Sequence, residues 1–178
     1  MKLYHGSDTS GITLLRPFLS NHGKPYVYFT DSEVLATVYA HNPVSRPNCF
    51  HTYRFREDGV LCYDEYFENQ LEEIYAGQTG YVYECEGDFP KMERMPWVYL
   101  AEQEVTVCKC TEIPDIYSQL LQYENEGRLV IQRWHTVSES QRKIWRKVVR
   151  DSLQEIDIST PVGREYANFI RAHFSIEP

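Results

Sequence analysis

The chain has 178 residues, of which 42% are hydrophobic and 25% are charged, and its formal net charge is −8. These values are typical of a globular protein long enough to bury a substantial core, and the acidic balance argues against broad electrostatic binding to nucleic acid. No apolar run approaches the roughly 20 residues of a membrane span, and the N-terminus lacks the pattern of a signal peptide. We therefore expect a cytoplasmic protein with no membrane partner.

The first third of the chain contains one clear strand followed by one clear helix. Residues 26–30, YVYFT, form a β-branched and aromatic run that predicts a buried strand. Thr30 and Glu33 have the spacing of a capping box, which predicts that a helix begins there and continues through VLATVYAH. The two prolines of NPVSRPN then end the helix.

The middle of the chain is rich in predicted strands. Residues 49–55 and 80–89 are typical of strands, with a short amphipathic helix expected between them at residues 63–77. Two more strand-like segments follow at residues 97–102 and 104–110.

Beyond Pro114 the pattern becomes helical. We expect helices at residues 115–127, 138–154 and 160–174, with Ser138 and Thr160 as caps. The basic residues of the second helix fit an acidic partner, but a solvated face is the simpler interpretation. The predicted division is a domain at residues 1–112 and a helical C-terminal extension at residues 113–178, packed on or beside it.

The cysteines indicate neither a disulfide framework nor a metal centre. Their number is odd, and their spacing is irregular. Cys108 and Cys110 alternate around Lys109, so a strand places both on one face, but a metal site needs two further ligands and no second pair lies nearby. We expect no metal and buried thiols at the five positions, Cys49, Cys62, Cys85, Cys108 and Cys110.

The N-terminal segment places a histidine, a glycine and a serine directly after a short apolar run. His5, Gly6 and Ser7 follow Leu3-Tyr4, and these residue types are compatible with an ordinary strand end and turn. Taken in order with YVYFTDSEVLATVY and with a glutamate that opens the run EVTV, however, they form a recognisable series.

This series resembles the ADP-ribosyltransferase superfamily, in its diphtheria-toxin-like His-Tyr-Glu branch. That branch includes poly(ADP-ribose) polymerases and bacterial rifampin ADP-ribosyltransferases. The resemblance covers about residues 2–110 and implies an α+β fold, a split antiparallel β-sandwich that holds NAD in its cleft. The helical extension lies outside it.

The resemblance also implies roles for individual residues. His5 would bind a ribose hydroxyl of NAD, the co-substrate, and Gly6 would offer its backbone to the nicotinamide carboxamide, with Ser7 as a further polar contact. Tyr28 and Tyr39 would sandwich the nicotinamide ring. The catalytic set is then His5, Tyr28 and Glu104.

The acidic position of the series has two candidates. Glu102 and Glu104 share a strand face, and we prefer Glu104 because it begins the apolar run, as the family's glutamate begins its strand. Glu102 would then help to receive the acceptor. Ala36 stands where polymerase members carry a serine that contacts the carboxamide.

The predicted function is therefore mono-ADP-ribosyl transfer from NAD to an unidentified acceptor. Three alternatives stay open: an NAD glycohydrolase, an RNA 2′-phosphotransferase on a related fold, and a non-catalytic interaction module. The acceptor class and the oligomeric state are not indicated by the sequence.

Overall fold

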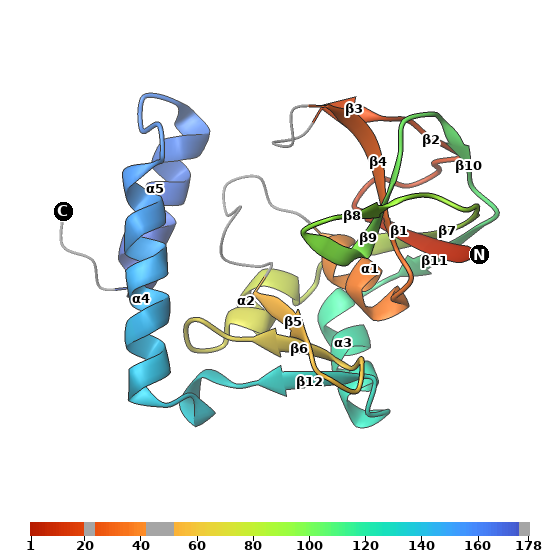
Figure 1. The fold of residues 1–178 in the computed structure, drawn as a ribbon. Helices are drawn as coiled ribbons and strands as arrows, with labels where there is room; N and C mark the ends of the chain where they lie inside the picture. The colour runs from red at the N-terminus through yellow and green to blue at the C-terminus, as the bar shows by residue number, and fades with distance from the viewer. Residues whose placement is uncertain (20–23, 42–51, 175–178) are drawn as a thin grey trace. The chain divides into compact units, whose positions relative to one another are not determined.

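A computed structural model describes the chain except for residues 20–23, 42–51 and 175–178. The described residues have a mixed α+β structure with mainly antiparallel sheets and five α-helices (Figure 1). Contacts group the chain into two compact units: unit 1 is residues 1–41 and 77–121, and unit 2 is residues 42–76 and 122–178. The units are interleaved along the chain, whereas the predicted domains are contiguous.

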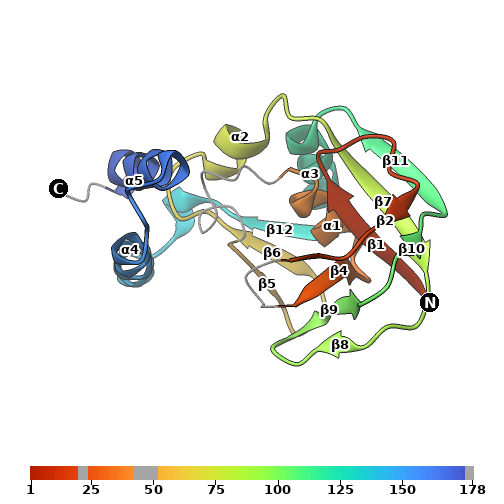
Figure 2. The same cartoon turned by 90° about the horizontal axis from the view of Figure 1, so that it is seen from above.

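Unit 1 is built around an antiparallel sheet with the strand order β11-β7-β1-β4-β9-β8, with β3 pairing to β4 (Figure 2). The first four strands in the chain are β1 (Lys2–Ser7), β2 (Leu14–Leu15), β3 (Phe18–Leu19) and β4 (Pro25–Thr30). The others in unit 1 are β7 (Gly80–Glu86), β8 (Lys91–Met92), β9 (Met95–Ala101), β10 (Val105–Thr106) and β11 (Lys109–Ile113). The strands β2 and β10 form a separate antiparallel pair.

A hydrophobic cluster joins these strands. It contains Leu3 of β1, Val27 and Phe29 of β4, and Leu15 and Val105 of the β2–β10 pair. The cluster therefore connects β1 and β4, which carry His5 and Tyr28, with β10, which directly follows Glu104.

The helix α1 (Glu33–Tyr39) follows β4 and packs on β1, β4 and β7. Its predicted position is confirmed, but its cap is not Thr30. The Ser32 hydroxyl accepts a hydrogen bond from Leu35 N at 3.2 Å, whereas the Thr30 hydroxyl accepts from Ser32 N and forms the turn before the helix. The cap is Ser32 because it directly precedes the first helical residue.

Unit 2 contains a three-stranded sheet in which β5 (Tyr53–Phe55) is antiparallel to β6 (Leu61–Asp64) and β12 (Leu129–Gln132) is parallel to it. The extension at residues 113–178, expected to be helical as a whole, also contains the strand β12, between two of the predicted helices. The run LVIQ is short and β-branched, and its strand pairing is with residues more than 60 positions earlier.

The helices expected after Pro114 are otherwise present. They are α3 (Ile116–Asn125), α4 (Glu139–Gln154) and α5 (Pro161–Phe174), with a short 3₁₀ helix, η1 (Trp134–Thr136), before α4. Ser138 caps α4 by accepting from Gln141 N, and Thr160 caps α5 by accepting from Gly163 N. Both predicted caps are confirmed.

The core of unit 2 has an aromatic centre and a buried carboxylate. Phe67 packs with Val149 of α4 and with an aromatic stripe of α5, Tyr166, Phe169 and Phe174. Before α2 (Gln70–Tyr75), the carboxylate of Glu65 accepts hydrogen bonds from Leu71 N at 3.1 Å and Trp134 N at 3.0 Å. This single side chain ties the start of α2 to η1.

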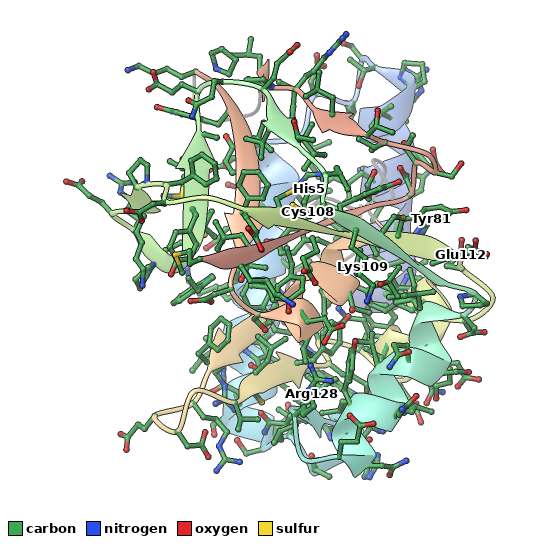
Figure 3. All side chains as sticks on the ribbon, turned by 90° about the vertical axis from the view of Figure 1, so that its right-hand side faces the viewer. His5, Tyr81, Cys108, Lys109, Glu112 and Arg128 are labelled. Atoms are coloured by element: carbon green, nitrogen blue, oxygen red, sulfur yellow. The ribbon has the colours of Figure 1, made fainter. Side chains whose placement is uncertain are left out.

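The cysteines divide into buried and exposed pairs. Cys62 and Cys85 are buried as predicted, and burial raises the pKa of each thiol to about 11. The expectation of buried thiols is wrong for Cys108 and Cys110, which are exposed. Cys110 lies on β11, the edge strand of the sheet, and Cys108, labelled in Figure 3, directly precedes that strand. Cys49 lies outside the described residues.

Candidate functional site

The strand β1 carries His5 at the point where it separates from β4. β1 pairs with β7 along its whole length, but its registered pairing with β4 is at Tyr4 and Thr30. Beyond that pair, the His5 ring spans the gap, because its Nδ1 lies 2.8 Å from the carbonyl oxygen of Tyr28. Two of the predicted site residues are thus in direct contact.

This contact fixes the chemical form of His5. A carbonyl oxygen only accepts hydrogen bonds, so Nδ1 must donate, and in the neutral ring Nε2 is then an acceptor. Burial lowers the pKa of His5 below its ordinary value of 6.5, and the bond to Tyr28 opposes this only in part. His5 is therefore a neutral imidazole at physiological pH with its acceptor nitrogen defined.

Gly6 lies directly beneath α1. A Cβ built on Gly6 would be 1.9 Å from the carbonyl oxygen of Ala36 and 2.7 Å from Ala40 N, both of which are backbone atoms. No side chain fits there without moving the helix. The packing of β1 against α1 therefore requires a glycine at position 6, whether or not a ligand binds there.

The two tyrosines come from the elements that surround Gly6. Alternation along the strands from the Tyr4–Thr30 pair places Gly6 and Tyr28 on the same face of the sheet, which is the face that α1 covers. Tyr39 is the last residue of α1. The ring of Tyr28 also contacts Phe18 and Tyr26, with centroid separations of 5.6 and 6.1 Å.

Ser7 ends β1 and supports the turn that follows. Its hydroxyl accepts a hydrogen bond from Thr9 N at 3.1 Å. The hydroxyl of Tyr83, on β7, donates to Thr9 O at 2.7 Å and accepts from Ile12 N at 3.3 Å. Tyr83 therefore holds the loop after β1, a role that sequence reasoning missed because 74 residues separate it from Thr9.

Glu104 directly precedes β10, as expected for a residue that opens a strand. Its carboxylate forms an ion pair with Arg16 at 3.1 Å, and the two side chains are 53% and 75% exposed. An ion pair this exposed contributes little to stability. Glu102 is also exposed.

Glu104 is connected to the other site residues by the packing of its neighbour in the hydrophobic core. Val105, the next residue, is buried in the same cluster as Leu3, Val27 and Phe29. Arg16 was not predicted as a site residue. The sequence feature that could have marked Arg16 is its position directly after Leu14-Leu15. The pairing of β2 with β10, which brings Arg16 to Glu104, depends on the tertiary fold and is not visible in the sequence.

We expect the substitution Gly6→Ala to destabilise unit 1 by about 3 kcal/mol, because the added methyl group overlaps backbone atoms of α1. Urea unfolding measures the change. Gly11→Asn is the control, since a Cβ there meets nothing within 4 Å and asparagine tolerates its φ of +71°. A Gly6→Ala variant within about 0.5 kcal/mol of wild type would contradict the close packing of β1 on α1.

The lowered pKa of His5 predicts a loss of stability at acid pH. Below pH 6.5, the ordinary value, the unfolded chain binds a proton at His5 that the folded chain does not, so the free energy of unfolding falls as pH decreases. The substitution His5→Asn keeps a donor for the Tyr28 carbonyl but does not titrate.

Unfolding curves at pH 7.5 and 5.5 should therefore show a larger loss for wild type than for His5→Asn, by up to about 1.4 kcal/mol. Equal losses in the two proteins would indicate that His5 titrates alike in the folded and unfolded chains.

Comparisons with known proteins do not identify the site. No protein-family model matches the chain, and comparisons with curated proteins and with solved structures give no match. Across the described part of the chain, no helix is long and apolar enough to cross a membrane, and no three His, Cys, Asp or Glu residues gather as metal ligands. The function must be argued from the residues themselves.

Proposed function

We propose that this chain is an NAD-dependent mono-ADP-ribosyltransferase of the His-Tyr-Glu type, with unit 1 as its split β-sandwich and NAD as its co-substrate. The observation that carries the proposal is the hydrogen bond from His5 Nδ1 to the carbonyl oxygen of Tyr28, at 2.8 Å. It joins the first two residues of the series at the point where β1 and β4 separate.

His5 would recognise a ribose hydroxyl of NAD. A hydroxyl donates readily to a neutral imidazole nitrogen, and Nε2 is the acceptor in the tautomer that the Tyr28 carbonyl selects. Because burial keeps the ring neutral, His5 would not repel the positive charge of the nicotinamide ring.

The nicotinamide ring would lie near Gly6, Tyr28 and Tyr39. Gly6 would offer its backbone groups at the edge where β1 separates from β4, because α1 fills the space that a side chain would take, and the two tyrosines would supply flat aromatic faces for a planar ring. Ser7 would add a polar contact at the end of β1, where its hydroxyl already accepts from Thr9 N.

Glu104 would act on the reacting carbon. Cleavage of the bond between ribose C1′ and the nicotinamide nitrogen leaves its electron pair on nicotinamide, which departs neutral, and leaves an oxocarbenium-like ribose. A carboxylate stabilises that positive charge. The acceptor nucleophile then bonds to C1′, and its proton passes to Glu104 or to water.

The ion pair with Arg16 affects whether the Glu104 carboxylate can face the ribose. The Arg16 guanidinium neutralises the Glu104 carboxylate at 3.1 Å. Because both side chains are exposed, separating them costs little, and the carboxylate is free to face a cationic centre.

The RNA 2′-phosphotransferase alternative is less favoured. That reaction needs basic groups to hold a phosphate. Three arginines that could hold a phosphate, Arg16, Arg54 and Arg56, each pair with a carboxylate, at Glu104, Asp64 and Asp58 respectively. Arg46 lies outside the described residues.

The remaining two alternatives differ from the proposal in what happens to NAD. An NAD glycohydrolase would use water as the acceptor. A non-catalytic module would keep the fold but not the turnover, and Ala36 is the residue that favours it, since its buried side chain has no hydroxyl for a carboxamide.

The matched substitutions Glu104→Gln and Glu102→Gln test the proposal. We expect Glu104→Gln to lower nicotinamide release at least about 100-fold, because a neutral amide cannot stabilise the oxocarbenium charge, while NAD still binds. Glu102→Gln should keep nicotinamide release within about threefold of wild type, because we expect Glu102 to help receive the acceptor and not to stabilise the ribose; any larger loss should fall on the ADP-ribose retained by the acceptor.

The assay measures nicotinamide released and labelled ADP-ribose retained on protein, nucleic-acid and small-molecule acceptors. Release without retention would identify the glycohydrolase. Absence of release from wild type, with NAD saturating and acceptors present, would refute the proposal and favour the non-catalytic module.

A further inference from the structure

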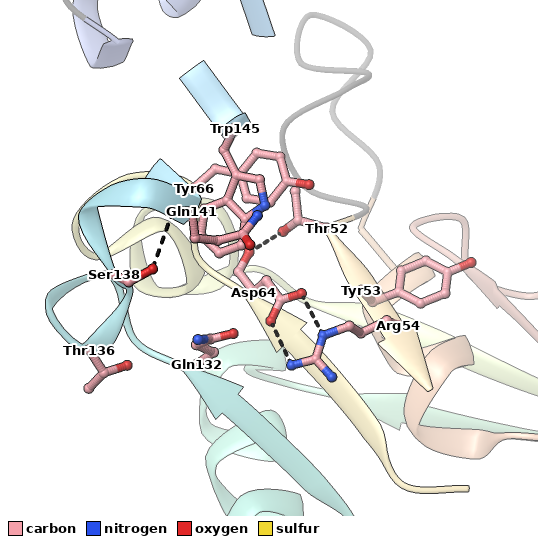
Figure 4. A pocket seen from close by; sticks show the side chains of 10 residues that line it. All are labelled: Thr52, Tyr53, Arg54, Asp64, Tyr66, Gln132, Thr136, Ser138, Gln141 and Trp145. Carbon is pink, nitrogen blue, oxygen red and sulfur yellow. Dashed lines mark hydrogen bonds and ion pairs between the residues drawn. The ribbon is translucent and has the colours of Figure 1, made fainter. Parts of the chain in front are cut away.

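Unit 2 contains a cavity of about 700 Å³ that the proposed transferase chemistry does not use (Figure 4). Its volume lies in the range of small-molecule sites, roughly 300 to 1,000 Å³. All of its lining residues belong to unit 2. The cavity is thus a feature of one compact unit.

The cavity lies at the carboxyl ends of two parallel strands. The last registered pair of β6 and β12 is Asp64 with Gln132, and both side chains line the cavity. Ser138 and Gln141, at the start of α4, also line it. Ligands in α/β structures commonly bind at this end of parallel strands, where side chains from several elements converge.

The charged groups in the lining neutralise each other. Arg54 Nε lies 3.2 Å from an Asp64 carboxylate oxygen, and Asp64 is only 8% exposed (Figure 4). The Ser138 hydroxyl already accepts a hydrogen bond from Gln141 N, so this backbone N–H in the first turn of α4 is not available to an anion. With Arg54 and Asp64 paired, the lining carries no net charge for an ionic ligand, and the cavity therefore fits an uncharged molecule.

Two side-chain amides in the lining are available for a ligand. In the part of the chain that the structure describes, neither the Gln132 amide nor the Gln141 amide has a hydrogen-bond partner in the protein. Each amide offers an acceptor beside a donor. They come from different elements, β12 and α4, so a ligand between them would meet two such pairs.

One wall of the cavity is aromatic and fixed. Trp145 of α4 stacks on Tyr66 with a centroid separation of 4.4 Å and an angle of 17° between the rings. Trp145 is only 7% exposed, so the wall is held by the core of the unit. Because Trp145 is buried, the half-buried ring of Tyr66 is the part of this wall that a flat or ring-shaped ligand would contact.

We propose that this cavity binds a nucleoside. The edge of a base carries a donor beside an acceptor, which is the pattern that a glutamine amide pairs with through two hydrogen bonds. The ribose supplies hydroxyls for the remaining acceptors of the Asp64 carboxylate and the donors of Arg54. A nucleoside without phosphate also has the neutrality that the lining requires.

Nuclear magnetic resonance of the full ¹⁵N-labelled chain tests this site directly. The probes are adenosine, guanosine, cytidine and uridine, with ribose, glucose and inorganic phosphate as separate arms. We expect at least one nucleoside to shift the side-chain amide signals of Gln132 and Gln141 in a saturable manner, with ribose, glucose and phosphate shifting them far less.

Matched variants locate the binding. Gln132→Leu and Gln141→Leu should each weaken nucleoside binding about tenfold, because each removes one pair of hydrogen bonds. Gln154→Leu, on the same helix but outside the cavity, should bind as wild type does. Backbone spectra of the variants verify that the fold is retained.

Several outcomes would overturn the assignment. Equal shifts with ribose or glucose would make the cavity a sugar site, and shifts with phosphate would make it an anion site. Absence of shifts with every probe would show that the wild-type cavity binds none of these classes. Because the readout is binding in unit 2, it is independent of whether unit 1 cleaves NAD.

Discussion

The close approach of β1 to α1 at Gly6 is the constraint on which unit 1 depends. β1 lies between β7 and β4 in the sheet, and α1 rests on it so closely that a Cβ would come within 1.9 Å of the Ala36 carbonyl oxygen. Any larger residue would lift the helix and shift Tyr39 at its end. The glycine thus sets the distance between the strand and the helix that carry the candidate site.

The two faces of β1 pack against different parts of unit 1. Gly6 faces α1, whereas Leu3 on the opposite face is fully buried in the cluster that also holds Val105, next to Glu104. His5 shares the parity of Leu3, and its ring lies edge-on to Phe29 while its Nδ1 reaches the Tyr28 carbonyl. The proposed ribose contact is therefore held by packing and by a hydrogen bond at once, which is how a site is preorganised.

Local patterns in the sequence were sufficient for the elements whose signals are local. The strand at Pro25–Thr30, the helix that follows it, and the capped helices after Ser138 and Thr160 are present as predicted. The capping error at α1 has a local cause too, because two hydroxyl residues lie close together before the helix and only Ser32 bonds to its first turn.

Features that depend on distant partners could not be predicted. The pairing of β12 with β6, the ion pair of Arg16 with Glu104, and the support of the β1 loop by Tyr83 each join residues more than 60 positions apart. The exposure of Cys110 on the edge strand β11, and of Cys108 directly before it, depends on where that strand lies in the sheet, which alternation along one strand does not reveal. The cavity beside Gln132 and Gln141 is assembled in the same way, from β5, β6, β12 and α4.

A crystal structure of the chain with NAD tests the central claim most directly. The account predicts that His5 Nε2 accepts a hydrogen bond from a ribose hydroxyl, within about 3 Å, with the nicotinamide ring between Tyr28 and Tyr39 and the Glu104 carboxylate turned from Arg16 towards ribose C1′. NAD bound elsewhere, or a ribose that faces Glu102 with His5 Nε2 unused, would contradict it.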